Sequence, residues 1–133
     1  MGAKLQFAKV IDRELFYNKG GRLHPKLKNE VVIQDEPGMV GAFLVIRGWG
    51  DDHGSATEQW RIESPAGLVV YESVPRELHL ATRSHVERLE DEVADLELEF
   101  AADDYNVVFL LDEREVARVE FPVRVAGSEP LGA

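Results

Sequence analysis

Residues 100–125 read FAADDYNVVFLLDEREVARVEFPVRV and contain two apolar runs separated by a charged segment. From Tyr105 to Leu111, and again from Ala117 to Val125, an apolar side chain recurs at every second position. Successive side chains of a β-strand point to opposite faces, so this period predicts two strands. The polar segment Asp112–Glu115 is expected to be the turn of the hairpin that joins them. Proline cannot donate to a strand ladder, so Pro122 indicates an edge strand.

Further strands are predicted upstream of this hairpin. The segment Met39–Trp49 is almost continuously apolar, which is typical of a central strand covered on both faces. Residues Thr57–Glu63 alternate, with the large apolar residues expected to point inward. Ser64–Gly67 has proline second and glycine fourth, as in a type I turn, and Leu68–Tyr71 then returns as the partner strand. Two more candidate strands are Lys4–Ile11 and Glu30–Gln34, with turns at Asn18–Gly21 and Glu36–Gly38.

The acidic segment before the hairpin fits two patterns. Between Val86 and Leu96 the apolar residues recur at helical spacing, and Ser84 followed by Glu87 matches a capping box. The apolar residues after Leu96 alternate as in a strand. We predict a short helix over residues 84–92 and a strand over about 94–100, with one long twisted strand as the alternative.

Short strands, frequent turn signals and at most one short helix predict an all-β chain. The expected architecture is an immunoglobulin-like antiparallel two-sheet β-sandwich. In such folds a tyrosine at the start of the penultimate strand bonds back to nearby backbone, and Tyr105 occupies that position. A chain of 133 residues suits a single domain. We expect this domain over residues 1–126 and a flexible tail over residues 127–133.

A resemblance supports this fold. The order WRIESPAGLVVYES (residues 60–73), then LELEFAADDYNVVFLLDEREVARVEFPVRV (residues 96–125), is similar to bacterial immunoglobulin-like sandwich domains without assigned function. The opening LQFAKVIDREL (residues 5–15) looks like the first strand of such domains. This sequence has Asp104 where the family pattern usually has glycine before the tyrosine. The resemblance implies a fold, and it carries over no functional residue.

The charge of the chain is negative overall and unevenly distributed. The formal net charge is −10, which argues against a nucleic-acid partner because binding to phosphates rests on clustered Lys and Arg. Residues 87–104 carry nine acids and one base, a net of −8. Residues 1–29 carry seven bases and two acids, a net of +5. We expect the first strand to pack beside the acidic segment so that these charges cancel within a monomer or homodimer.

The compartment follows from what the sequence lacks. There is no cysteine, which excludes disulfides and thiolate chemistry and fits a reducing cytoplasm. The N-terminal residues lack the apolar core of a signal peptide. No stretch approaches the roughly 20 apolar residues that span a bilayer. We therefore expect a cytoplasmic protein without a membrane partner.

One loop carries residues that could bind a metal. Asp51, Asp52 and His53 lie between glycines in the segment Gly48–Ser55, and both residue types bind divalent ions. Adjacent aspartates point apart on most backbones, and no second His or Glu follows at ligand spacing. We therefore favour a solvated glycine-rich loop and expect no metal or cofactor.

Other candidate catalytic groups lack the context that their chemistry needs. Ser55 and Ser84 have no nucleophile-elbow motif around them. Carboxylates are plentiful between Glu87 and Asp104, as a glycosidase would require. They alternate with apolar residues, which is typical of a solvated strand face and of protection against edge pairing. The remaining histidines are expected at the surface: His24, His79 and His85.

These patterns favour a non-enzymatic protein without catalytic residues. We expect an immunoglobulin-like interaction or accessory module with a protein partner that the sequence does not identify. The first alternative is a small-ligand or divalent-metal-binding protein that uses the loop Asp51–His53. A hydrolase that uses paired carboxylates is a weaker alternative.

Overall fold

The computed structural model describes residues 1–24, 26–34 and 38–126. It is 57% strand and 5% helix, which confirms the all-β class. The predicted tail at 127–133 and most of the predicted turn at Glu36–Gly38 lie outside the described residues. The elements are β1 (Lys4–Asp12), α1 (Arg13–Asn18), β2 (Val31–Ile33), β3 (Gly38–Met39), β4 (Phe43–Gly50), β5 (Gly54–Glu63), β6 (Val69–Glu72), β7 (Arg76–Leu80), β8 (Glu87–Val93), β9 (Glu97–Leu98), β10 (Tyr105–Leu111), β11 (Arg114–Phe121) and β12 (Val123–Val125).

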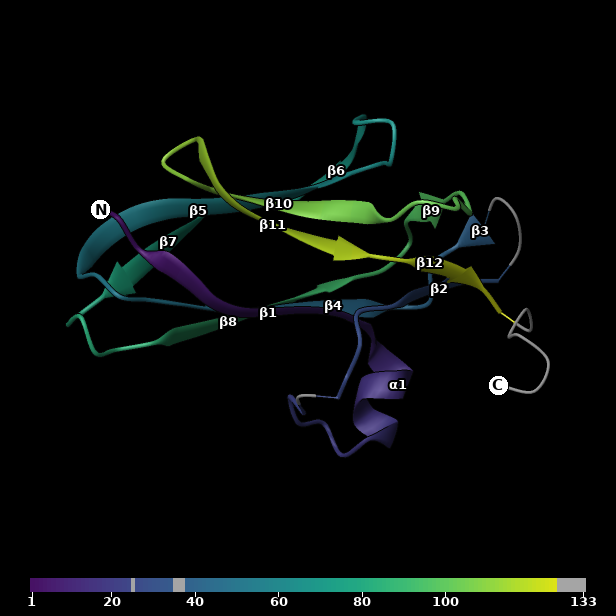
Figure 1. The fold of residues 1–133 in the computed structure, drawn as a ribbon, viewed down its shortest axis with the longest axis horizontal. Coiled ribbons are helices and arrows are strands. Elements are labelled where there is room, and N and C mark those ends of the chain that lie inside the picture. The colour runs from purple at the N-terminus through teal and green to yellow at the C-terminus, as the bar shows by residue number, and fades with distance from the viewer. Residues whose placement is uncertain (25, 35–37, 127–133) are drawn as a thin grey trace.

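The strands form two facing layers, with α1 projecting from one of them (Figure 1). The first layer has the order β1-β4-β8, with antiparallel pairing on both sides of β4. Every residue of β4 is buried, which confirms the prediction of a central strand in this region. The second layer has the order β11-β10-β5-β6, and β7 pairs with the other half of β5.

The C-terminal hairpin that predicted the fold is present as β10 and β11. Its turn is tighter than the expected segment Asp112–Glu115, since β11 already begins at Arg114. Asp112 and Glu113 have φ of 50° and 68°, the left-handed pair that a two-residue hairpin turn requires. At the far end, Pro122 separates the edge strand β11 from β12, which pairs in parallel with β2. The edge position that Pro122 indicated is confirmed.

The predicted helix over residues 84–92 is wrong. This segment forms β8, which pairs with β4 along its whole length. Exposure alternates along β8, with Leu89, Asp91 and Val93 on the better buried side. The helical spacing of the apolar residues was therefore coincidental, and pairing with β4 decides the structure. The strand predicted over 94–100 is reduced to β9.

Helix α1 was not predicted, because its six residues are too few to show a helical period. Asp12 caps it by accepting a hydrogen bond from the N–H of Leu15 at 3.0 Å. The predicted turn after it is present: Gly20 and Gly21 donate to the carbonyls of Tyr17 and Phe16. Among the described residues, no helix is long and apolar enough to cross a membrane.

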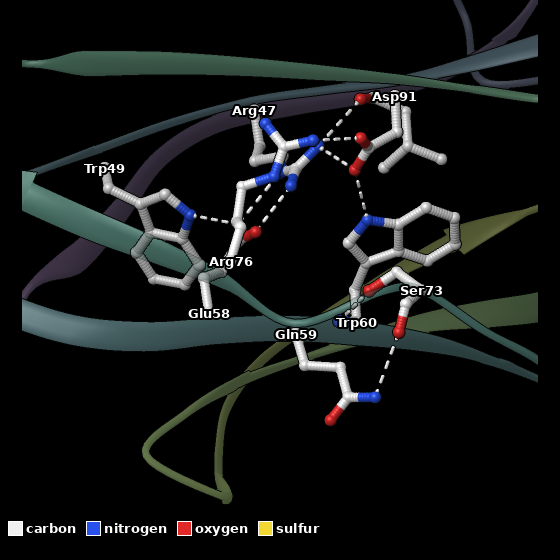
Figure 2. A network of polar contacts seen from close by, with 9 residues as sticks. Arg47, Trp49, Glu58, Gln59, Trp60, Ser73, Arg76 and Asp91 are labelled. Atoms are coloured by element: carbon white, nitrogen blue, oxygen red, sulfur yellow. Dashed lines mark hydrogen bonds and ion pairs between the residues drawn. The ribbon is translucent and has the colours of Figure 1, made fainter.

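A charged network lies between the two layers (Figure 2). Arg47 of β4 is fully buried, and Glu58 of β5 is 1% exposed. Arg47 donates to both carboxylate oxygens of Glu58, from Nε at 2.8 Å and from Nη2 at 2.5 Å. Its Nη1 donates to Asp91 of β8 at 2.8 Å. Burial opposes the charge of Arg47, but its bonds to Glu58 and the carboxylates of Glu58 and Asp91 outweigh burial and raise its pKa.

Two indole groups and a second arginine complete the network. Trp49 donates from Nε1 to Glu58 at 2.6 Å, and Trp60 donates from Nε1 to Asp91 at 2.7 Å. Arg76 of β7 also binds Asp91, so four strands from both layers share one set of polar contacts. Every buried side-chain nitrogen or oxygen of the described residues has a hydrogen-bond partner. The desolvation of the two buried charges is thereby compensated.

Tyr105 makes the backbone bond that its position predicted. Its hydroxyl donates to the carbonyl of Glu99 at 2.7 Å, and the hydroxyl oxygen accepts the N–H of Glu99 at 3.2 Å. The ring is buried and stacks on Phe121, with centroids 5.8 Å apart. The phenol therefore ties the segment after β9 to the start of β10.

The prediction that the first strand packs beside the acidic segment is wrong. Strands β1 and β8 occupy opposite edges of β4, because β4 pairs with both. A salt bridge from Arg13 to Glu92 at 2.9 Å links the two charged regions within the chain.

We expect Arg47→Met to lower the free energy of unfolding by about 3–5 kcal/mol, because it leaves Glu58 buried without its partner. Urea denaturation measures the change. Arg88→Met is the matched control, since Arg88 pairs with Glu90 at the surface and such pairs contribute about 1 kcal/mol at most. Equal losses in the two variants would contradict a stabilising role for the buried network.

Tyr105→Phe should cost about 1 kcal/mol or more, because both backbone groups of Glu99 lose their partner while the ring is retained. The denaturation midpoint reports this loss. Tyr17→Phe is the control, since Tyr17 is 53% exposed, and we expect no change. A midpoint that Tyr105→Phe leaves unaltered would mean that the phenol bond does not stabilise the fold.

Candidate functional site

A groove of about 490 Å³ opens beside Tyr105, between the start of β6 and the segment around β9. One wall carries Leu68 and Val70, and the other carries Leu98, Phe100 and Ala101. Its surface is mostly apolar, which favours noncovalent contacts with apolar side chains. Apart from Tyr105, which begins β10, the lining residues lie in short segments outside the central strands of the sandwich.

The first wall begins at the predicted turn, which the structure confirms. The N–H of Gly67 donates to the carbonyl of Ser64 at 2.8 Å, and the N–H of Ser64 donates to the carbonyl of Leu68 at 2.7 Å. Gly67 has φ of 86°, a conformation that side chains rarely adopt. These contacts fix the position of Leu68 at the mouth of the groove.

A β-bulge sets the direction of the next side chains. Ile62 pairs with Tyr71 and Glu63 pairs with Val69, so Val70 is an extra residue opposite the step from Ile62 to Glu63. Such a bulge changes the direction in which a strand presents its side chains. In this strand it places Val70 in the groove while Tyr71 stacks on the core residue Trp60, with centroids 5.3 Å apart.

The second wall depends on Tyr105. Leu98 is buried and belongs to β9, which pairs with β3. The phenol bond to Glu99 holds the next residue of the chain, and Phe100 follows with 54% of its surface exposed. Because the ring of Tyr105 also lines the groove, one residue both fixes this wall and forms part of the surface.

The groove lies beside an exposed apolar strand edge. Leu68 is 68% exposed, Val69 47% and Val70 38%. Val74, directly after β6, is 84% exposed. Soluble proteins seldom leave several consecutive large apolar residues uncovered on an edge strand, because such an edge invites pairing with another chain.

The polar residues at the groove are acidic or already engaged. Glu97 and Glu99 line it and are exposed, and none of its described lining residues is Lys, Arg or His. The hydroxyl of Ser64 accepts a hydrogen bond from the N–H of Leu68 at 3.2 Å, and that of Tyr105 bonds the backbone of Glu99. Both hydroxyls therefore hold the walls of the groove in place.

The loop Asp51–His53, our candidate metal site, holds the N-terminal segment. The carboxylate of Asp52 accepts the N–H of Gly2 at 2.5 Å and that of His53 at 2.8 Å, and these bonds lower its pKa. Asp51 faces Lys4 at 3.4 Å. In the described part of the chain, no three His, Asp or Glu residues are placed to share a metal ion.

The histidines lie at the surface as predicted. One forms a contact that the sequence did not reveal, since Ser55 Oγ lies 3.0 Å from His79 Nδ1 across the pair β5–β7. Within the described residues no carboxylate bonds to His79, so the pair lacks the third group of a hydrolase triad. His24 accepts the N–H of Lys26, and His85 lies 3.5 Å from Glu87.

The groove is not evident from the sequence. Tyr105 and the Ser64–Gly67 turn were predicted as features of the fold, and Glu97 and Glu99 were expected on a solvated face. The available signal was the run Leu68–Tyr71, which lacks the polar alternation of a strand with one wet face. That run was interpreted as an ordinary partner strand, and its exposure depends on the bulge.

No family model matches the sequence, and no curated protein matches it either. Among solved structures, the chain is similar to the Pseudomonas fluorescens alkylpurine DNA glycosylase AlkC bound to DNA containing an abasic site analog. The sequence identity is 11% and the TM-score is 0.46. The match covers 92% of this chain and 30% of that chain, so the protein spans under a third of the glycosylase's length.

Asp52→Asn should lower the free energy of unfolding at neutral pH. The substitution replaces the charged carboxylate that accepts two backbone N–H groups with a neutral amide, which is a weaker acceptor. The folded-state pKa of Asp52 lies below its ordinary value of 3.8. The contribution of the Asp52 carboxylate to stability is therefore present above pH 3.8 and is lost as the pH falls through the folded-state pKa. The difference in free energy of unfolding between wild type and Asp52→Asn should stay constant from neutral pH to about pH 5. Below about pH 5 this difference should decrease toward zero.

Urea unfolding across this pH range measures the difference. Asp51→Asn is the control, since Asp51 forms an exposed ion pair with Lys4 and should contribute less. A difference for Asp52→Asn that persists in acid would show that the carboxylate does not act through its charge.

Proposed function

We propose that the protein is a non-enzymatic interaction module of the bacterial immunoglobulin-like kind, and that it binds a protein partner through the groove between β6 and β9. The observation that carries the proposal is the exposed apolar wall formed by Leu68 and Val70, with Phe100 opposite. Fully burying an apolar side chain of this size contributes about 1.5–3 kcal/mol, so a partner that covers all three gains substantial binding energy.

Comparison with two other edge strands supports this proposal. Strand β8 carries Arg88, Glu90 and Glu92 at its exposed positions. Strand β11 is followed directly by Pro122 and carries charges along its length. Both edges therefore have the features that prevent pairing with other chains. Strand β6, VVYE in sequence, has one charge at its end. The edge that borders the groove therefore has less protection against pairing with another chain than β8 and β11 have.

The proposed cellular setting is the cytoplasm, since a stable chain without cysteine suits a reducing compartment. In this proposal the partner is a protein rather than a nucleic acid or a membrane. The acidic groove supports this choice, because phosphate-bearing surfaces would be repelled by Glu97 and Glu99.

Selection of a random peptide library on the immobilised protein tests the proposal. We expect peptides enriched on the wild type to bind Leu68→Asp and Val70→Asp at least tenfold more weakly. In the complex the new carboxylate would be buried against the peptide, and the desolvation of a charge costs free energy. Because both side chains are already solvent-exposed, the variants should keep the wild-type circular dichroism spectrum and melting temperature.

Val86→Asp and Val116→Asp are the controls, as these valines are 46% and 45% exposed and do not line the groove. They introduce the same charge and should leave binding intact. If the enriched peptides bind all four variants equally, or if nothing is enriched, the groove is not the binding site of an interaction module.

A further inference from the structure

We infer that the occupant of the groove is an extended, apolar and basic segment of another protein, which adds as a strand to the outer edge of β6. This inference rests on the proposed function and specifies its partner. It combines three observations: an edge strand with a free side, an apolar groove beside that side, and acidic residues around both.

The free edge follows from the sheet order. Strand β6 ends the order β11-β10-β5-β6, and no strand of the described residues pairs with its outer side. Ser73 donates its N–H to the carbonyl of Trp60 at 2.8 Å, toward β5. Because hydrogen-bonding directions alternate along a strand, the N–H and C=O of Glu72 point outward. An added strand would bond these groups, as in β-strand addition.

The groove can accommodate the side chains of such a strand. Leu68 and Val70 face the groove rather than the core, because of the bulge. A strand beside β6 would present alternate side chains toward Leu68, Val70 and Phe100, and would leave its intervening side chains at the exposed rim of the site, where Glu72, Glu97 and Glu99 lie. The main-chain bonds would then supply affinity, and the groove would select apolar residues at every second position.

The charges around the groove determine the other positions of the segment. Glu97 and Glu99 line the groove, and Glu72 is exposed on the edge itself. No Lys, Arg or His lies among the described lining residues. The chain as a whole carries a net charge of −10, which attracts basic partners over longer distances. Lys or Arg between the apolar positions therefore complements the site.

The same charges argue against a second copy of this chain as the occupant. A two-fold dimer through the four-residue strand β6 would gather Glu72, Glu97 and Glu99 of both copies around one short strand pair. Like charges directly opposite each other destabilise a strand pair. A different chain with basic residues has no such repulsion.

Titration with two short synthetic peptides tests the inference, one alternating Val and Lys and the other alternating Val and Glu. We expect the Val–Lys peptide to bind at least about tenfold more tightly, and we expect added salt to weaken it because exposed charges are screened. The double variant Glu97→Gln and Glu99→Gln should weaken the Val–Lys peptide several-fold. The control Glu77→Gln and Glu113→Gln changes net charge equally away from the groove and should have little effect.

Strand addition is tested with methylated amides. Methyl groups on the alternate peptide amides that face β6 remove hydrogen bonds and should reduce affinity at least tenfold. Methyl groups on the intervening amides face away from β6 and should be tolerated. Equal effects of the two patterns would overturn strand addition.

The possible failures are distinguishable. If the Val–Glu peptide binds as well as the Val–Lys peptide, or if groove-dependent peptides from the library are neutral or acidic, the inferred partner is wrong and the groove remains a binding site. If no peptide binding depends on Leu68 or Val70, both the inference and the proposed function are wrong. A concentration-dependent dimer that Val70→Asp abolishes would identify a second copy as the occupant.

Discussion

The contact between Arg47 and Glu58 constrains the rest of the sandwich. Both side chains are almost fully buried, and each compensates the charge of the other only in a fixed geometry. Asp91 joins them from β8, where it alternates with Leu89 and Val93 on the better buried side. A slip of β8 by one residue would move Asp91 to the solvent face. The network thus selects the register of β8 against β4 as well as the pairing of the two layers.

The groove follows from this arrangement. With β5 held by Glu58 and Trp60, its edge is filled in turn by β6 and β7, and the bulge at Val70 marks the departure of β6 from regular pairing. On the opposite wall, the bond from Tyr105 to Glu99 fixes the chain after β9. A rigid interior therefore supports two short edge elements, where binding surfaces commonly occur because fewer contacts hold them in place.

The sequence predicted the elements whose side chains alternate or are uniformly apolar. The hairpin β10–β11, the buried strand β4, the Ser64–Gly67 turn and the bond of Tyr105 were all predicted from local patterns. The six-residue α1 is too short to show a period. In residues 84–92 the apolar spacing fitted a helix, whereas pairing with β4 imposed a strand. Such pairing depends on distant residues and leaves no local signal.

The candidate site was less predictable for the same reason. Arg47 lies in an apolar run, and nothing local indicates that Glu58 and Asp91 meet it. The groove brings together Leu68 and Phe100, which are far apart in the chain. The Asp51–His53 loop was a candidate metal site because its residue types suit metals. In the structure, Asp52 instead accepts the backbone N–H groups of Gly2 and His53.

Amide hydrogen exchange measured by NMR tests the central claim, that a rigid charged interior supports an open edge at β6. Amides in β4, β5 and β10 should exchange only through global unfolding. At β6, the N–H of Ser73 bonds to Trp60 and should be protected, whereas the neighbouring outward N–H of Glu72 should exchange at least about a hundredfold faster. Equal protection of Glu72 and Ser73 in the free protein would show that the edge is already covered, which would contradict an open binding site.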